Sequence, residues 1–323
     1  MSDKTSSTFK LNSAMCWAKV KMALLRCFAI LIGLSLGTFA LAQAPSEGLQ
    51  PGQSLGAYLG MHSLPNLRDI GGYKTVNGLI VKRGVTYRSN AFNFMTAQDL
   101  VKADSLKLKN DYDLRTTAEI GPEPDIIPAG VHYTQLNVLA DASGLAMPPD
   151  ELAKIFQDPK NANEKLGGSA GVNNLFIQIY QGIISLPSAR HSYQSLFLSL
   201  LNPTSSPNVF HCTNGKDRTG WGAAALLTLL GVPKDVVYED YLKSNNYLLP
   251  FHQKEIDEFV AKGGDPVIPN AIFGVKPTYL DAAFDEMNIR YGSIEQYFSE
   301  GLKINRAQQK QLREIYLTRN SSN

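Results

Sequence analysis

"HCTNGKDRTG" (residues 211–220) places a cysteine, a lysine, an aspartate and an arginine among small residues. The two residues that come before His211 and Cys212, Val209 and Phe210, are typical of the end of a buried strand. The residues that follow, "WGAAALLTLL", are typical of a buried helix that ends at Gly231. The stretch therefore predicts a turn from a strand into a helix.

Such a turn can bind an anion. If the backbone amides of residues 213–218 converge, they form a nest at the positive end of the following helix, and a phosphate fits there. Cys212 at the floor of the nest would have its thiolate stabilised by the amides, by the helix terminus and by Arg218. The sequence thus predicts a phosphate site with a reactive cysteine at its base.

The other residues of the turn add charge and shape to this site. Arg218 offers a planar fork that matches two phosphate oxygens, and Lys216 adds a point charge at the rim. Thr219 can donate its hydroxyl to the thiolate, while Gly215 and Gly220 let the backbone bend and pack closely. The residues expected to bind the phosphate alongside Arg218 are Thr213, Asn214, Gly215, Lys216, Thr219 and Gly220.

The first 42 residues differ in composition from the rest of the 323-residue chain. Lys19, Lys21 and Arg26 precede an uncharged apolar run, "CFAILIGLSLGTFALA", which ends in small residues. This order predicts a signal peptide cleaved after Ala42; an uncleaved anchor is the alternative, but spanning a bilayer takes about 20 apolar residues. We expect an exported protein, periplasmic or secreted, with a linker over 43–59 and no membrane anchor after cleavage.

Removal of this leader changes the charge and the cysteine content. It carries five of the 31 basic and one of the 29 acidic residues, so the mature chain has a net charge of −2. No basic patch remains to indicate nucleic acid or an anionic membrane as a partner. Cys212 becomes the only cysteine in an oxidising compartment and cannot form an internal disulfide. The five histidines show no paired ligand spacing, so we expect no metal site.

The order of apolar segments predicts an α/β fold in a single domain. Short strands are expected within 79–87, 112–115, 131–136 and 207–211, and the C-terminal third has helical periodicity. We expect a central, mostly parallel sheet flanked by helices.

The stretch of about 141–175 is too long for an ordinary connection. Its "PPDELAKIF" can form a helix and its "GGSAG" is expected to be loose. We interpret the stretch as a helical insertion that is either a lid over the turn or a surface insertion without a role in access.

Cys212, five further residues, Arg218 and Thr219 form the Cys-x5-Arg-Thr signature of protein tyrosine phosphatases, and the GKDRTG version resembles a bacterial family of these enzymes. That family includes secreted enzymes that act on phosphotyrosine and, in some members, on phosphoinositides. Other segments are similar to further motifs of the family, in the same order: "NLRDIGGYKTVNGLIVKRGVTYRSN" (66–90), "YDLRTTAE" (112–119), "LLGVPKDVVYEDYLKSNNYL" (229–248) and "YLDAAFDEMNIRYGSIEQYF" (279–298). The resemblance implies a phosphatase domain over 60–323.

The resemblance also implies a phosphomonoester hydrolase with a cysteinyl-phosphate intermediate. Cys212 would attack phosphorus while Arg218, Lys216 and the loop amides take up the charge of the oxygens. Asp217 is expected to be the general acid, and Asp141, which follows a predicted strand, is the alternative, with a turn or helix cap as its structural role. No metal or organic cofactor is implied. The expected substrate is a phosphorylated protein, or a phosphoinositide or inositol phosphate.

Two other classes of function remain open from the sequence. A non-catalytic phosphate-binding module would be expected to lack the nucleophile or the arginine, and this chain has both. A sulfurtransferase of the rhodanese type also carries its loop after a strand, but the "GKDRTG" ending and "NLRDIGGY" do not suit it. Beside the loop, we expect Asp113 and Arg115 to brace the nest, and Arg68 and Asp69 to brace the N-terminal turn.

Overall fold

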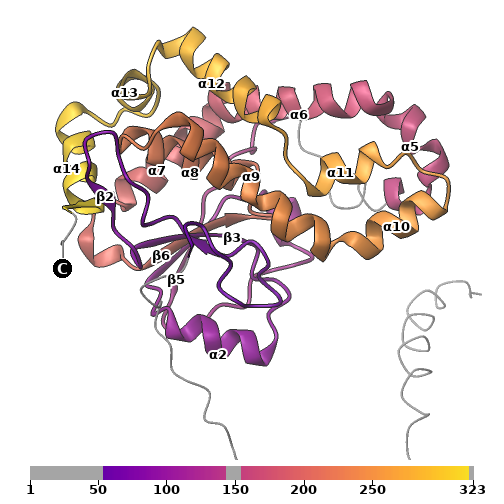
Figure 1. Cartoon of the computed structure of the whole chain (residues 1–323), viewed down its shortest axis with the longest axis horizontal. Coiled ribbons are helices and arrows are strands. Elements are labelled where there is room, and N and C mark those ends of the chain that lie inside the picture. The colour runs from indigo at the N-terminus through magenta and orange to yellow at the C-terminus, as the bar shows by residue number, and fades with distance from the viewer. Residues whose placement is uncertain (1–53, 143–153, 320–323) are drawn as a thin grey trace, which may run out of the picture. The chain divides into compact units, whose positions relative to one another are not determined.

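The computed structural model describes residues 54–142 and 154–319 of the chain (Figure 1). The expected signal peptide, most of the linker and the 143–153 part of the expected insertion lie outside the described residues. Within the described ranges, no helix combines the length and the apolar character needed to cross a membrane.

A five-stranded sheet forms the centre of the described part of the chain, with the strand order β1-β3-β6-β4-β5. The strands β3, β6, β4 and β5 are parallel to one another, and β1 pairs with β3 in the antiparallel direction. The strands are β1 (Arg68–Asp69), β3 (Thr86–Asn90), β4 (Asn110–Asp113), β5 (His132–Gln135) and β6 (Asn208–Cys212). The predicted mostly parallel α/β sheet is confirmed.

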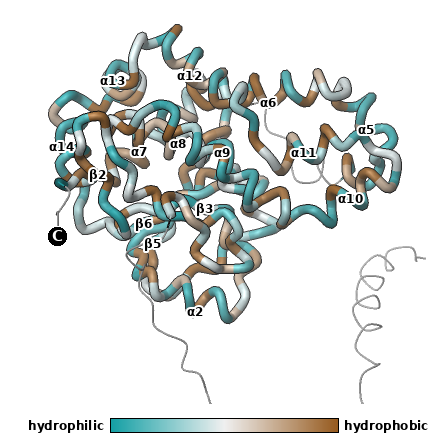
Figure 2. Tube along the Cα trace, in the orientation of Figure 1, coloured by the Kyte–Doolittle hydropathy of each residue, from teal (hydrophilic) through white to brown (hydrophobic). Residues whose placement is uncertain are grey.

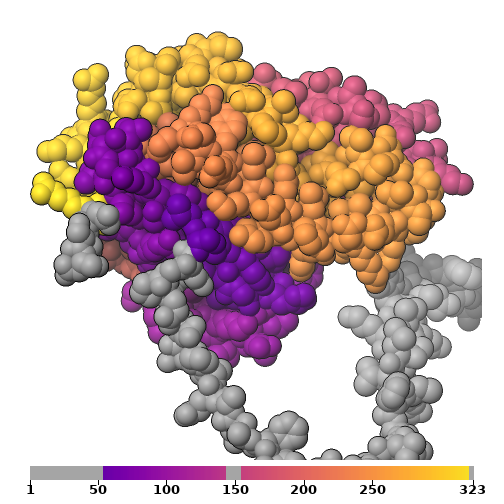
Figure 3. All heavy atoms as spheres, viewed as in Figure 1, coloured from indigo at the N-terminus to yellow at the C-terminus, as the bar shows by residue number. Residues whose placement is uncertain are grey.

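The segment 79–87 does not form the single strand that the sequence predicts. It is divided between β2 (Ile80–Val81), which pairs with β7 (Leu317–Thr318) in a separate two-stranded sheet, and the start of β3. The chain turns between them at Gly84, which has φ 72° and donates its amide to Asp69 Oδ2 at 2.7 Å. In Figure 3 the indigo atoms around β2 accordingly lie against the yellow atoms of the C-terminal segment.

The register brings the carboxyl ends of β3, β6 and β4 to one edge of the sheet. Asn90 is paired with Cys212, and Asp113 is paired with His211. Ligands of open parallel sheets bind at the carboxyl ends of the strands. Because β6 lies between β3 and β4, the segments that follow all three strands can contribute to one site beside Cys212.

Two hydrophobic cores in the described residues cover the two faces of the sheet. The smaller core contains Val209 and residues of α2 (Ala97–Ser105), which lies alone on its side of the sheet in Figure 1. The larger core contains Phe210 and Cys212, as the alternation of side chains along a strand requires.

The helices that contribute to the larger core are α5 (Pro159–Leu166), α6 (Gly168–Ser185), α7 (Pro187–Ser199), α8 (Arg218–Leu229), α9 (Lys234–Phe251), α10 (Gln253–Ala261), α11 (Val267–Phe273), α12 (Pro277–Tyr291), α13 (Ile294–Gln296), η2 (Tyr297–Gly301) and α14 (Arg306–Tyr316). Two further short helices are α3 (Thr117–Ile120) and η1 (Pro203–Ser205). The hydropathy changes between teal and brown along α10 (Figure 2), where the apolar Ile256 and Phe259 are buried and the charged Lys254 and Glu258 are exposed.

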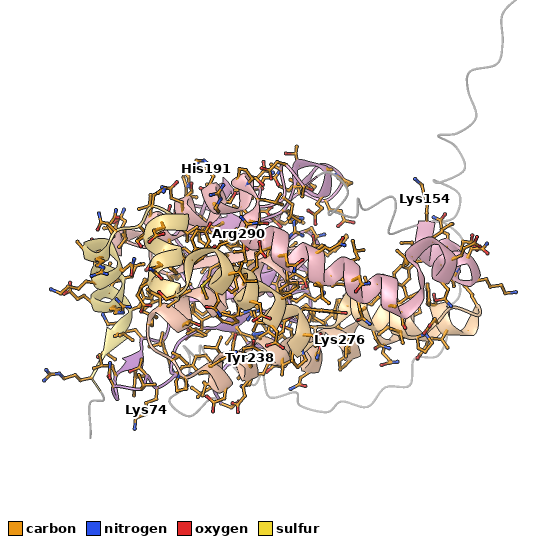
Figure 4. The ribbon with its side chains drawn as sticks, turned by 90° about the horizontal axis from the view of Figure 1, so that it is seen from above. Lys74, Lys154, His191, Tyr238, Lys276 and Arg290 are labelled. Carbon is orange, nitrogen blue, oxygen red and sulfur yellow. The ribbon has the colours of Figure 1, made fainter. Side chains whose placement is uncertain are left out.

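The described part of the expected insertion is integrated into the larger core. The prediction of a loose "GGSAG" is wrong, because Gly167 ends α5 with φ 70° and α6 begins at the next residue. Phe176 of α6 stacks on Tyr279 of α12 at 5.1 Å between ring centres. Asn173 Oδ1 accepts hydrogen bonds from Lys276 Nζ at 2.7 Å and from Tyr279 OH at 2.8 Å; Lys276 is labelled in Figure 4. α6 is therefore held by α12.

A buried ion group joins β1, β3 and α9. Arg88 Nη1 lies 2.6 Å from Asp240 Oδ2, and Arg68 Nη1 lies 3.5 Å from Asp240 Oδ1. Tyr73 OH donates to Asp240 Oδ1 at 2.8 Å. All four side chains are buried, so the carboxylate of Asp240 is the counter charge for two guanidinium groups that have little access to water.

Asp240→Asn is expected to destabilise the domain strongly. It removes the counter charge of two buried guanidinium groups, and breaking a buried ion pair costs about 3–5 kcal/mol. Denaturant unfolding near neutral pH measures the loss. The matched control is Asp104→Asn, whose partner Lys107 is exposed; there we expect about 1 kcal/mol or less. Equal losses in the two variants would contradict a role for the buried group.

The pH dependence of this effect follows from the direction of the pKa shift. Burial raises the pKa of Asp240, but the charges of Arg68 and Arg88 outweigh burial and hold the pKa below its usual value. The stabilisation by the carboxylate is therefore present above the unfolded pKa of about 3.9 and is lost as the pH falls through the lower folded value. The difference in unfolding free energy between wild type and Asp240→Asn should shrink in acid.

Candidate active site

The loop between β6 and α8 has its carbonyl oxygens held by buried donors. Asn66 Nδ2 donates to Asn214 O at 2.9 Å and to Gly215 O at 3.0 Å. Arg88 Nη2 donates to Gly215 O at 2.9 Å. In a trans peptide the carbonyl and the next amide point in opposite directions. The amides of Gly215 and Lys216 are therefore turned away from Asn66 and Arg88.

The amides of this loop are available to an anion. In the described parts of the chain, no backbone amide from Asn214 to Arg218 donates a hydrogen bond to another group. α8 begins at Arg218, so the amides of its first turn are also without helical acceptors. Asp217 is in the N-cap position, yet its side chain does not cap the helix. This arrangement is consistent with the predicted nest.

Two glycines of the loop are required by space. Gly215 has φ 66°, and a Cβ atom there would lie 2.1 Å from Ser89 O. A Cβ atom at Gly220 would lie 3.2 Å from ring atoms of Tyr241. The first glycine lets the loop pass close to β3, and the second lets α8 pack against α9.

Glu119 holds the guanidinium group of Arg218. Glu119 Oε2 accepts from Nη1 and Oε1 accepts from Nη2, both at 2.7 Å, and Thr213 Oγ1 donates to Oε1 at 2.5 Å. Burial raises the pKa of Glu119, but Arg218 and these donors hold it well below its usual range, so the carboxylate stays charged. Nε and the second hydrogen of Nη2 lie on the other edge of the guanidinium, where they can bind two phosphate oxygens.

Glu119 is a site residue that the sequence did not predict, although it lies in "YDLRTTAE". A capping box places it: Thr116 Oγ1 accepts from Glu119 N at 3.2 Å, and Glu119 Oε2 accepts from Thr116 N at 2.9 Å. This box starts α3 shortly after the carboxyl end of β4. A Thr-x-x-Glu pattern soon after a strand is the signal that could have found it.

Lys216 does not lie at the rim of the loop, and that prediction is wrong. Its side chain is 1% exposed, with Nζ 3.0 Å from Asp217 Oδ1 and 4.5 Å from the centre of the Phe176 ring. Phe176 belongs to α6, whose position could not be read from the local sequence. α6 therefore covers the lysine.

The two candidates for the general acid have different surroundings. Asp141 Oδ2 accepts from Ser188 N at 3.0 Å, and its Oδ1 accepts from Ser188 Oγ, in the first turn of α7. Slight burial raises the pKa of Asp141, but the bonds from Ser188 outweigh burial and lower it. Asp141 is thus an ionised helix-capping residue. Asp217 lies in the loop itself, with 19% of its side chain exposed.

Cys212 lies at the carboxyl end of β6 with 1% of its surface exposed, and it is unpaired. The expected hydrogen bond from Thr219 to its sulfur is not present among the described residues. Thr219 Oγ1 is instead a buried hydroxyl without a partner. It remains a donor that can serve a thiolate.

The histidine that opens the loop, His211, lies in a buried ion cluster. Its Nε2 is 3.1 Å from Asp111 Oδ1 and 3.3 Å from Asp125 Oδ2. Burial lowers the pKa of His211, but Asp111 and Asp113 raise it well above its usual value, so the ring is positively charged. In the described residues, Asp111, Asp125 and His211 lie close enough together to hold a metal ion. The positive charges of His211 and Arg115 already balance these carboxylates.

The predicted brace between Asp113 and Arg115 is confirmed. Arg115 Nη2 lies 2.7 Å from Asp113 Oδ2 and 2.8 Å from Asp125 Oδ2. Burial raises the pKa of Asp113, but the positive charges of His211 and Arg115 lower it to about 2. This ion pair fixes the end of β4, the strand next to β6.

Known proteins resemble the chain over the same region. The profile of the tyrosine phosphatase family matches residues 59–318. A protein of Cupriavidus necator whose name places it among the tyrosine-protein phosphatases is 27% identical over 252 residues, which cover 77% of this chain and 86% of that protein. The triple specificity protein phosphatase PtpB of Mycobacterium tuberculosis is 24% identical over 254 residues, or 73% of this chain and 90% of its own.

The chain belongs to the tyrosine phosphatase family, as its match to the family profile over most of its length shows. It is a phosphatase, and the sulfurtransferase and binding-module alternatives are set aside.

Glu119→Gln is expected to lower kcat/KM by about 100-fold, because a guanidinium that is no longer held in place misplaces the charge that the transition state needs. Steady-state hydrolysis of 4-nitrophenyl phosphate measures the effect. The control is Glu123→Gln, whose carboxylate accepts a hydrogen bond from Asn93 rather than from Arg218 and should leave the rate almost unchanged. Similar rates in the two variants would rule out the positioning role of Glu119.

Proposed function

We propose that this phosphatase hydrolyses phosphomonoesters through a cysteinyl-phosphate formed on Cys212. The observation that carries the proposal is the position of Cys212 beneath a loop whose carbonyls are held outward and whose amides are available to an anion. Arg218, held by Glu119, adds two donors on its open edge. A dianionic phosphate bound there has positively charged groups beside its oxygens and the sulfur of Cys212 below its phosphorus.

The reaction has two steps. In the first, the Cys212 thiolate forms an S–P bond, the P–O bond to the leaving group breaks, and Asp217 gives its proton to the leaving oxygen. In the second, a water molecule attacks phosphorus, the S–P bond breaks, and the proton of the water passes to the Asp217 carboxylate. Arg218 and the loop amides hold the three equatorial oxygens throughout.

The substrate we propose is a phosphorylated protein, with phosphotyrosine as the first candidate. Support comes from the names of the relatives, which include a tyrosine-protein phosphatase and a triple specificity protein phosphatase. Phosphoinositides and inositol phosphates remain the alternative. The burial of Lys216 argues against its binding a second phosphate group at the rim. Export to the periplasm or beyond, directed by residues 1–42, belongs to this proposal and rests on the sequence.

Cys212→Ser is expected to reduce turnover to below about 1% of wild type, because an alcohol is a far weaker nucleophile than a thiolate. Binding of tungstate, a phosphate analogue, should change little, since the amides and Arg218 are retained. Hydrolysis of a phosphotyrosine peptide and titration calorimetry with tungstate measure the two quantities. Residual turnover above a few per cent in a clean preparation would contradict the assignment of Cys212 as the nucleophile.

Asp217→Asn is expected to slow aryl phosphates with poor leaving groups by about 100-fold, and those with good leaving groups far less, since general acid catalysis contributes about 10²–10⁴. It should also flatten the basic limb of the pH profile of kcat. The comparison is Asp141→Asn, which should keep both the limb and the wild-type ranking of substrates. If Asp141→Asn shows the leaving-group effect instead, the acid is wrongly assigned.

A further inference from the structure

A chain of buried hydroxyl groups ends on the carboxylate of Asp217. Tyr180 OH donates to Asp217 Oδ1 at 2.9 Å, and Tyr180 OH and Tyr241 OH are 2.7 Å apart. A tyrosine hydroxyl has one hydrogen, and an ionised carboxylate only accepts. Tyr180 therefore donates to Asp217, and Tyr241 donates to Tyr180.

The two oxygens of Asp217 are in different situations. Oδ1 also accepts a hydrogen bond from Lys216 Nζ at 3.0 Å, so two buried donors fix its position. Oδ2 has no hydrogen-bond partner among residues 54–142 and 154–319, and 19% of the side chain is exposed. The carboxyl group is tethered through one oxygen and open at the other.

We propose that Tyr180, held in turn by Tyr241, is a positioning residue that fixes Oδ1 of Asp217 so that Oδ2 carries the proton given to the leaving group. The inference rests on the proposed role of Asp217 as the acid. In the second step the same arrangement keeps Oδ2 free to take the proton of the attacking water.

Helices hold both tyrosines in place. The Tyr180 ring, on α6, meets the Tyr241 ring edge-on at 6.2 Å and the Tyr279 ring at 5.9 Å. The Tyr241 ring, on α9, lies against Gly220 in the first turn of α8. A site residue that is supported by packed helices keeps its geometry better than one supported by loops.

The charge state of Tyr180 suits this role. Burial, the charge of Asp217 and the neighbouring Tyr241 keep the pKa of the Tyr180 phenol well above its usual value, so the hydroxyl remains a donor. The titratable and charged groups that face Asp217 are Tyr180 on α6, Tyr193 on α7, Tyr241 on α9, Tyr279 on α12, and Lys216 and Arg218 in its own loop. A donor to the ionised form of an acid favours that form, so its loss favours the protonated acid.

Tyr180→Phe keeps the ring and removes the hydroxyl. We expect kcat for phenyl phosphate, which has a poor leaving group, to fall about 10-fold, while a substrate with a good leaving group changes less than about 2-fold. The basic limb of the pH profile of kcat should move to higher pH, which a merely structural role would not cause. The control is Tyr238→Phe, labelled in Figure 4, whose hydroxyl donates to Asp281 Oδ1 at 2.6 Å and which should change neither readout.

A double variant separates this inference from the function on which it rests. In an Asp217→Asn background, Tyr180→Phe should add no further leaving-group effect, because the two residues act through one proton. If Asp217→Asn itself shows no leaving-group effect, the proposed acid is wrong. If Asp217→Asn shows it and Tyr180→Phe does not, the positioning role of Tyr180 is overturned. Should Tyr180→Phe unfold, Tyr241→Phe replaces it. We then expect a smaller shift of the basic limb in the same direction, and an unchanged limb would count against the proposal.

Discussion

The loop after β6 can bind an anion only if its peptide groups face one way, and buried donors impose that orientation. Asn66 and Arg88 take the carbonyl oxygens of the loop, so the amides are presented on the opposite side. Arg88 can be buried there because Asp240 balances its charge. The backbone conformation of the loop thus depends on an ion pair that does not contact the substrate. A substitution in α9 that breaks this pair should alter the position of the loop amides.

The same logic extends to the charged side chains of the site. Four buried cations around the loop each have a carboxylate partner within 3.0 Å: Arg88 with Asp240, Arg115 with Asp113, Lys216 with Asp217, and Arg218 with Glu119. Removing one partner of such a pair leaves an uncompensated charge away from water. The pairs therefore fix the positions of the donors before a substrate arrives, which is the condition under which fixed dipoles and charges stabilise a transition state most effectively.

The helices beyond the sheet contribute side chains to the surroundings of the loop. α6 supplies Phe176 above Lys216 and Tyr180 beside Asp217, and α12 holds α6 through Asn173. The sequence indicates that a helical segment lies in this region, but it cannot show which side chains of that segment face the loop. Helical periodicity gives the buried face of a helix, whereas the partner of that face depends on how the helices pack.

The sequence by itself determined the strand, the turn and the helix around Cys212, and the class of the enzyme. The strand, the turn and the helix depend on residues a few positions apart, whose geometry the covalent chain sets, and the class follows from motifs that can be read in order along the chain. Only the tertiary structure decided which residues brace the loop and its acid, because Asn66, Glu119 and Tyr180 are distant in sequence and reach the loop through strand register and helix packing. It also decided that Lys216 is buried, since burial depends on what the rest of the chain places above a side chain.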